Sequence, residues 1–149
     1  MFDRIFPIRS TLDPATAAQL ARYIGLPYEY PDDPPHSYDC WSLCGAIRRE
    51  LGLVVPDERR STTLDRLAVD AGNAIASGRW RRCETAEWAL GSIILLGQNR
   101  RHCAVAIAPS EAMHAYAADG LRGSVRWDNA GALLRLFGSL EVWRHASDY

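Results

Sequence analysis

The stretch from residue 38 to residue 52, YDCWSLCGAIRRELG, predicts a helix that begins on a cysteine. Asp39 is a favourable N-cap and Gly52 a typical helix end. The spacing i, i+3, i+4, i+7, i+11 of an amphipathic helix is followed by Cys40, Leu43, Cys44, Ile47 and Leu51. We therefore expect Cys40 in the first helical turn, where the helix dipole favours the thiolate form. The same spacing also fits a cysteine that is simply part of the core.

Helical patterns surround this stretch and strand patterns follow it. Asp13-Pro14 opens a helix that Gly25 closes, and apolar residues from Leu64 to Ile75 mark a third helix. Short apolar or alternating runs then predict strands at 91–96, 103–108, 112–117, 124–128 and 140–144. This order indicates an α+β domain in which N-terminal helices pack on a C-terminal antiparallel sheet. We expect an arm over residues 1–11 and a single domain over residues 12–149.

Composition narrows the classes of partner. The formal net charge is −1, so bulk electrostatics favour neither a nucleic-acid partner nor an anionic membrane. The basic runs at 79–82 and 100–101 are short and are expected to be solvated surface. We predict no signal peptide, no membrane insertion and synthesis in a bacterial cytoplasm, because no apolar run approaches the required length. The four cysteines are too few for a disulfide scaffold and are expected to be thiols.

A nucleophilic cysteine needs a base, and two of the four histidines are placed to serve. His102 directly precedes the strand candidate at 103–108, which puts it at an edge of the sheet and able to face a cleft. His114 lies inside the next strand candidate, so a hairpin would make the two histidines neighbours. A second polar group beside the base can hold its ring in the useful tautomer. Taken alone, His102 also fits an ordinary surface position and His114 a hydrogen-bonded core position.

Five short motifs follow one another along the chain. They are YIGLPY at 23–28, YDC at 38–40 leading into a helix, GSIILL at 91–96, HCAVAI at 102–107 and MHA at 113–115. In this order and spacing they resemble the NlpC-type cell-wall cysteine peptidases, a papain-like family that cleaves peptidoglycan stem peptides. The resemblance covers residues 12 to 145. It implies the papain-like NlpC-type fold, with Cys40 as nucleophile, His102 as general base and His114 as the polar residue that orients the base.

The resemblance also implies further site residues. Tyr28 would place its hydroxyl near the oxyanion, together with the backbone N–H of Cys40. Asp39 would cap the helix and help to bind a polar end of the substrate, and Trp41 would also bind substrate. The implied chemistry is amide hydrolysis through a thioester, without cofactor or metal, at the D-glutamyl to diamino-acid bond of the stem peptide.

The chain departs from the usual family pattern at several positions. Trp41-Ser42 replaces the common Ser-Gly and, like LEVWR at 140–144, resembles the branch found in phage tails. Asp32-Asp33-Pro34-Pro35 replaces a glycine pair beside the cleft, and Ser92 replaces the usual aspartate. We therefore expect a component of a phage tail tip or tail-like particle, with tail-tip or baseplate proteins as partners. It would open the host wall in the periplasm during genome delivery.

Other interpretations are open. An effector amidase delivered by a secretion system would have the same size and site, and a structural tail-tip subunit could keep a vestigial site. A zinc site would use Cys40, Cys44, His102 and His114, but histidines 12 residues apart lack the close pairing of common zinc motifs. Cys44 is expected to be plain core, and Cys103 is assigned no role because strand alternation leaves its face open.

Overall fold

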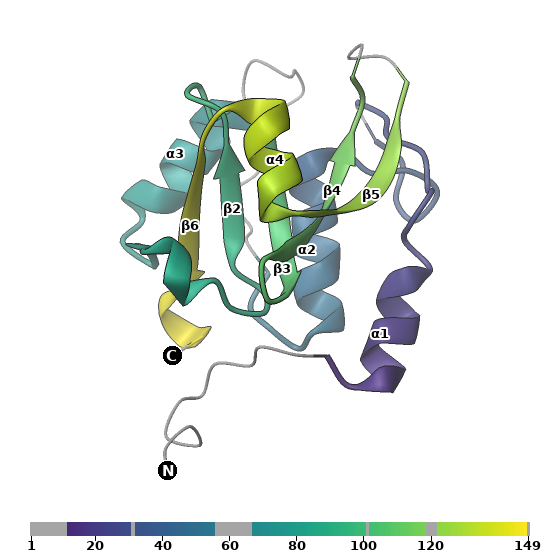
Figure 1. The fold of residues 1–149 in the computed structure, drawn as a ribbon, viewed down its shortest axis with the longest axis horizontal. Helices are drawn as coiled ribbons and strands as arrows, with labels where there is room; N and C mark the ends of the chain where they lie inside the picture. Colours follow the sequence, from purple (N-terminus) through teal and green to yellow (C-terminus); the bar gives the residue numbers. More distant parts are fainter. Residues whose placement is uncertain (1–11, 31, 56–66, 101, 119–121, 149) are drawn as a thin grey trace.

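The computed structural model describes residues 12–30, 32–55, 67–100, 102–118 and 122–148. The expected arm at 1–11 and the start of the third predicted helix lie outside the described residues. The elements, with η for 3-10 helices, are α1 (Pro14–Ala21), α2 (Cys40–Glu50), α3 (Leu67–Ala76), β1 (Trp80–Cys83), η3 (Thr85–Glu87), β2 (Ile93–Leu96), β3 (His102–Ala108), β4 (Glu111–Tyr116), β5 (Ser124–Asn129), α4 (Ala130–Phe137), β6 (Leu140–His145) and η4 (Ala146–Asp148) (Figure 1).

Within the described residues the strands form one six-stranded sheet in the order β1-β6-β2-β3-β4-β5. All neighbouring strands pair antiparallel. The predicted α+β class with an antiparallel sheet is therefore confirmed. In the described part of the chain, no helix combines the length and the apolar character needed to cross a membrane.

Helices cover both faces of the sheet (Figure 1). On one face α2 lies against β3 and β4, and its Leu43 and Ile47 share a core with Val105 and Met113. On the other face α4 contributes Leu133 to a second core, which includes Ala104 and Ala106 of β3 and Ala112 of β4. Successive side chains of a strand point to opposite faces, so neighbouring residues of β3 serve different layers. This alternation decides which side chains can approach the start of α2.

Helix α4 and strand β1 were not predicted, and neither were the short helices η3 and η4. Helix α4 is capped at its start by Asn129, whose side chain accepts a hydrogen bond from the backbone N–H of Ala132, and at its end by Gly138, with a left-handed φ of 85°. Strand β1 carries the basic run, with Trp80 and Cys83 buried and the two arginines between them exposed. The expectation of a wholly solvated basic run was therefore wrong for Trp80, which the arginine charges on either side obscured.

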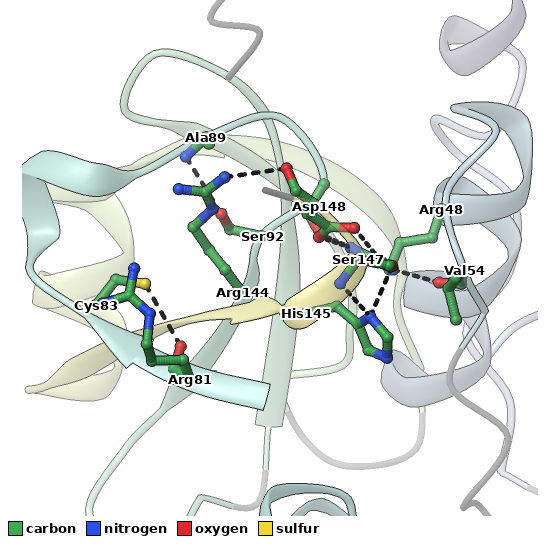
Figure 2. A network of polar contacts seen from close by, with 11 residues as sticks. Arg48, Val54, Arg81, Cys83, Ala89, Ser92, Arg144, His145, Ser147 and Asp148 are labelled. Atoms are coloured by element: carbon green, nitrogen blue, oxygen red, sulfur yellow. Dashed lines mark hydrogen bonds and ion pairs between the residues drawn. The ribbon is translucent and has the colours of Figure 1, made fainter. Parts of the chain in front are cut away.

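Arg48 anchors α2 to the C-terminal end of the described chain (Figure 2). Its guanidinium is fully buried and donates to both carboxylate oxygens of Asp148, at 2.9 and 3.0 Å. It also donates to the backbone oxygens of Val54 at 2.6 Å and Gly91 at 2.7 Å. A buried charge is tolerated when it is paired and hydrogen-bonded, as Arg48 is here. The contacts fix the helix that carries Cys40 relative to the sheet.

Candidate active site

Asp39 fixes the start of α2. Its backbone is extended, with φ −89° and ψ 178°, and its carboxylate accepts the backbone N–H of Ser42 at 2.8 Å. The Asp39 N–H lies 3.2 Å from the Ser42 hydroxyl, which completes a capping box. The Ser42 hydroxyl also donates to the carboxylate of Asp32. Cys40 is thereby held as the first residue of the helix, at the positive end of its dipole.

Cys40 is an enclosed and acidic thiol. Cys40 is 3% exposed. The pKa of Cys40 lies well below the usual thiol range, chiefly because the Cys103 thiol hydrogen-bonds to it, although burial acts in the opposite direction. A hydrogen bond and the charge of His102 lower the pKa of Cys40 further, as does a backbone hydrogen bond from Cys103. These contacts favour the thiolate, which is the reactive form of a cysteine.

Cys103 joins Cys40 to Cys44. The Sγ atoms of Cys44 and Cys103 are 3.6 Å apart. Burial raises the pKa of Cys103 well above the usual range, and the hydrogen bonds to Cys40 and Cys44 act in the same direction. Cys103 therefore stays a protonated donor to the Cys40 thiolate. All four cysteines of the chain lie within the described residues, and all are free thiols.

Three hydrogen-bonded side chains on neighbouring strands form a series that begins beside Cys40. Nε2 of His102 lies 2.8 Å from Nδ1 of His114, and Nε2 of His114 lies 2.7 Å from Oδ2 of Asp128. The three residues come from β3, β4 and β5, which are neighbours in the sheet. The predicted hairpin of β3 and β4 is present, and it makes the two histidines neighbours. His102 is the first residue of an interior strand, so it lies where strands end and not on an edge strand.

His114 is held in its neutral form. Burial lowers the pKa of His114 to about 4, the charge of His102 adds to this effect, and the hydrogen bond that His114 donates to Asp128 partly offsets it. Its side chain is fully buried. At neutral pH the ring therefore carries one proton and presents one donor and one acceptor.

Aromatic side chains hold the ring of His102 in place. The Phe137 ring at the end of α4 stacks on it, with centroids 4.7 Å apart and planes 17° apart. The Tyr116 ring at the end of β4 meets it edge-on at 5.6 Å. Helix α4 thus contributes a wall of the site that the sequence did not predict. The two contacts restrict rotation of the imidazole.

Tyr28 lies close to the cysteine. It is buried, and it is held by a bridge to Tyr38 and by its backbone N–H, which donates to Gly123 at 3.0 Å. Burial raises the pKa of Tyr28, and the nearby negative charge of Cys40 raises it further. The phenol therefore stays protonated and can donate a hydrogen bond near Cys40.

Asp39 and Trp41, the two residues predicted to bind substrate, are both buried at the start of α2. Asp39 is 0% exposed and its carboxylate caps α2. Trp41 is 5% exposed, because it lies on the side of α2 that faces the core. It lines a small apolar cavity with Ala74, Ile75, Trp80, Ile93, Leu95 and Trp143. Burial does not decide whether either residue contacts substrate, since Cys40 itself is 3% exposed, so both contacts stay predictions.

Asp128 is the residue of this cluster that sequence reasoning missed. It was placed in a strand, but the strand pattern did not show that it shares a face with His114. The antiparallel pairing of β4 with β5 was the available signal, since it brings their side chains together. For the zinc interpretation, the described residues contain no group of three or more histidine, cysteine or acidic side chains arranged to hold a metal ion.

No protein-family model matches the chain, and a search of the curated proteins finds no significant match.

Proposed function

We propose that this chain is a papain-like cysteine hydrolase of the NlpC type, with Cys40 as nucleophile and His102 as general base. One observation carries the proposal: the acidic thiol at the start of α2 hydrogen-bonds to a histidine whose far nitrogen is held at 2.8 Å by His114. A nucleophile, a base and a group that orients the base are the parts that covalent acyl transfer needs. The proposal is also supported by the five motifs in their order along the chain.

The reaction follows from these positions. The Cys40 thiolate attacks the carbonyl carbon of an amide, forming a carbon–sulfur bond and an oxyanion. The Tyr28 hydroxyl and the backbone N–H of Cys40 donate to that oxyanion. His102 gives its proton to the amine as the carbon–nitrogen bond breaks, which leaves a thioester. His102 then takes a proton from water, the hydroxide attacks the thioester, and the acid product leaves as the carbon–sulfur bond breaks.

The substrate we propose is the peptidoglycan stem peptide, cut between D-glutamate and the diamino acid. The setting we propose is a phage tail tip or tail-like particle that opens the host wall in the periplasm. Trp41-Ser42 and the run at 140–144 support this setting through their resemblance to the phage-tail branch. An acidic thiol in contact with an oriented histidine favours an enzyme over a structural subunit with a vestigial site.

Defined muropeptides test the proposal directly. The purified protein is incubated with them and the products are identified by mass spectrometry. We expect a new amino terminus on the diamino acid, no product from Cys40→Ala or His102→Ala, and normal product from His36→Ala, an exposed histidine to which no catalytic role is assigned. Cleavage at another amide would point to the effector amidase. Full activity of Cys40→Ala would refute the assignment, and so would an inactive wild-type protein.

A further inference from the structure

Asp128 is the last member of a series of hydrogen-bonded side chains that runs from Cys40 through His102 and His114. It lies on β5, two strands away from His102, and touches neither Cys40 nor His102 in any contact of the described residues. Its Oδ2 atom binds Nε2 of His114 at 2.7 Å and lies 3.3 Å from Nε of Arg126. The carboxylate is 15% exposed, whereas Arg126 is 44% exposed. Asp128 thus has one partner turned towards the site and another turned towards solvent.

The donors and acceptors along this chain can be assigned in only one way. A carboxylate accepts and does not donate, so Nε2 of His114 must carry the proton in the bond to Asp128. Neutral His114 then has a lone pair on Nδ1, so that atom accepts from Nε2 of His102. Nε2 of His102 is consequently protonated whether or not His102 is charged. The nitrogen of His102 that remains to exchange a proton with Cys40 is Nδ1.

We propose that Asp128 is a positioning residue that acts through His114 to fix the tautomer and orientation of His102. Without the carboxylate, His114 is free to carry its proton on Nδ1. That proton would then oppose the Nε2 proton of His102, and the base would lose its fixed orientation towards Cys40. Asp128 holds His114 by accepting a hydrogen bond from its Nε2, as the acidic member of a serine-protease triad holds its histidine.

A merely structural role is the alternative. Asp128 could serve only to pair with Arg126 and stabilise β5. The two roles predict different effects of removing Asp128. If its role is structural, neither the tautomer of His114 nor the reactivity of Cys40 changes. The inference rests on the proposed function only for its effect on turnover.

Nitrogen NMR of the full chain, labelled with ¹⁵N histidine, reads the tautomers directly at pH 7. We expect wild-type His114 to be protonated at Nε2 and unprotonated at Nδ1, and His102 to be protonated at Nε2. In Asp128→Ala we expect His114 to show both tautomers, and in Asp128→Glu we expect the wild-type pattern to return. A wild-type His114 that carries its proton on Nδ1 overturns the proposal, even if every variant fails to fold.

Alkylation of Cys40 by iodoacetamide gives a second test that needs no substrate. We expect the rate at pH 7 to fall in Asp128→Ala and to recover in Asp128→Glu. The matched control is Glu141→Gln, a strand carboxylate whose partners are Arg100 and Trp143, and it should react as wild type. Unchanged alkylation and an unchanged His114 tautomer in folded Asp128→Ala would overturn the proposal.

Turnover separates this inference from the proposed function. In Asp128→Ala we expect kcat on muropeptides to fall on the order of 10- to 100-fold, the loss seen when the hydrogen-bond partner of a metal-binding histidine is removed, with KM little changed. A wild-type protein that cleaves no muropeptide but passes the NMR and alkylation tests refutes the substrate and upholds the role of Asp128. A drop in kcat with no change in either substrate-free test assigns Asp128 a structural role and overturns the inference.

Discussion

Nδ1 of His114 lies 2.8 Å from Nε2 of His102, so the buried histidine of β4 contacts one nitrogen of the proposed base and leaves the other nitrogen for Cys40. This contact links the Cys40–His102 pair to His114 and, through His114, to Asp128. It fits the role proposed for His114, which is to hold the proposed base and not to act as a second base, because a neutral ring that already donates to Asp128 has only one lone pair to offer. The predictions below test the parts that this contact joins.

Neutral, buried His114 makes stability depend on pH. Its pKa is about 4 in the folded protein, below the value of about 6.5 for a free histidine, so the unfolded chain binds a proton first as pH falls. The stability that neutral His114 contributes is fully present above about pH 6.5 and is lost as pH falls through about 4. We expect a loss on the order of 3 kcal/mol from this group.

Urea unfolding at pH 7, 6, 5 and 4 measures this loss. His114→Gln lacks the titrating ring, so its unfolding free energy should change less over the same interval. The difference between the two proteins removes the contribution of other acidic groups. Parallel pH curves would show that burial does not hold His114 neutral.

Tyr28→Phe removes a hydroxyl and nothing else. If that hydroxyl donates to the oxyanion, kcat should fall about 10²- to 10³-fold, as when other oxyanion donors are lost. The fold and the pKa of Cys40 should change little, because the phenol stays neutral and its ring is kept. Steady-state kinetics on a muropeptide measures the effect, with Tyr30→Phe as a matched control. An unchanged kcat would remove Tyr28 from the mechanism.

Cys103→Ala should raise the pKa of Cys40. The Cys103 thiol is the strongest influence that lowers this pKa, and a hydrogen bond to a charged group is worth about 1.5–3 kcal/mol, which corresponds to about one to two pH units. Cys103→Ser keeps a donor and should move the alkylation midpoint back towards wild type. Cys44→Ala is the control. It also removes a thiol that contacts Cys103, but the groups that lower the pKa of Cys40 are Cys103 and His102. Equal midpoints in the alanine and serine variants would argue against the thiol donor.

Asp148→Ala should be strongly destabilising. It leaves the fully buried charge of Arg48 unpaired, and breaking a buried pair in this way costs about 3–5 kcal/mol. Glu87→Gln is the matched control, because it breaks an exposed pair with Arg81 and should cost about 0–1 kcal/mol. Urea unfolding followed by tryptophan fluorescence compares the two. A similar small loss in both variants would show that Arg48 does not need its partner.

Local signals predicted most of the fold. The cap at Asp39 and the helical spacing after it are properties of adjacent residues, and α2 begins where they indicate. The five predicted strands are all present, with bounds within two residues of those observed. Helix α4 was not predicted, because a segment of eight mostly apolar residues cannot be distinguished from a strand by periodicity. Its signals were the cap at Asn129 and the glycine at 138.

The site was predictable only where motifs carried it. Cys40, His102 and His114 stand in recognisable local sequences, and the structure brings them together. Asp128 and Cys103 do not, because their contacts depend on strand register, and a slip of one residue would turn either side chain to the opposite face. The register Ala112↔Asp128 and the pairing of Leu95 with Cys103 are tertiary facts that no single strand pattern contains.

The rate of Cys40 alkylation as a function of pH, followed on the Cys40 peptide by mass spectrometry, tests the central claim most directly. An activated nucleophile should show a midpoint well below the value of about 8.5 for a free cysteine, because Cys103 and His102 stabilise the thiolate. The midpoint should rise towards that value in His102→Ala. A wild-type midpoint at or above about 8.5 would contradict the account.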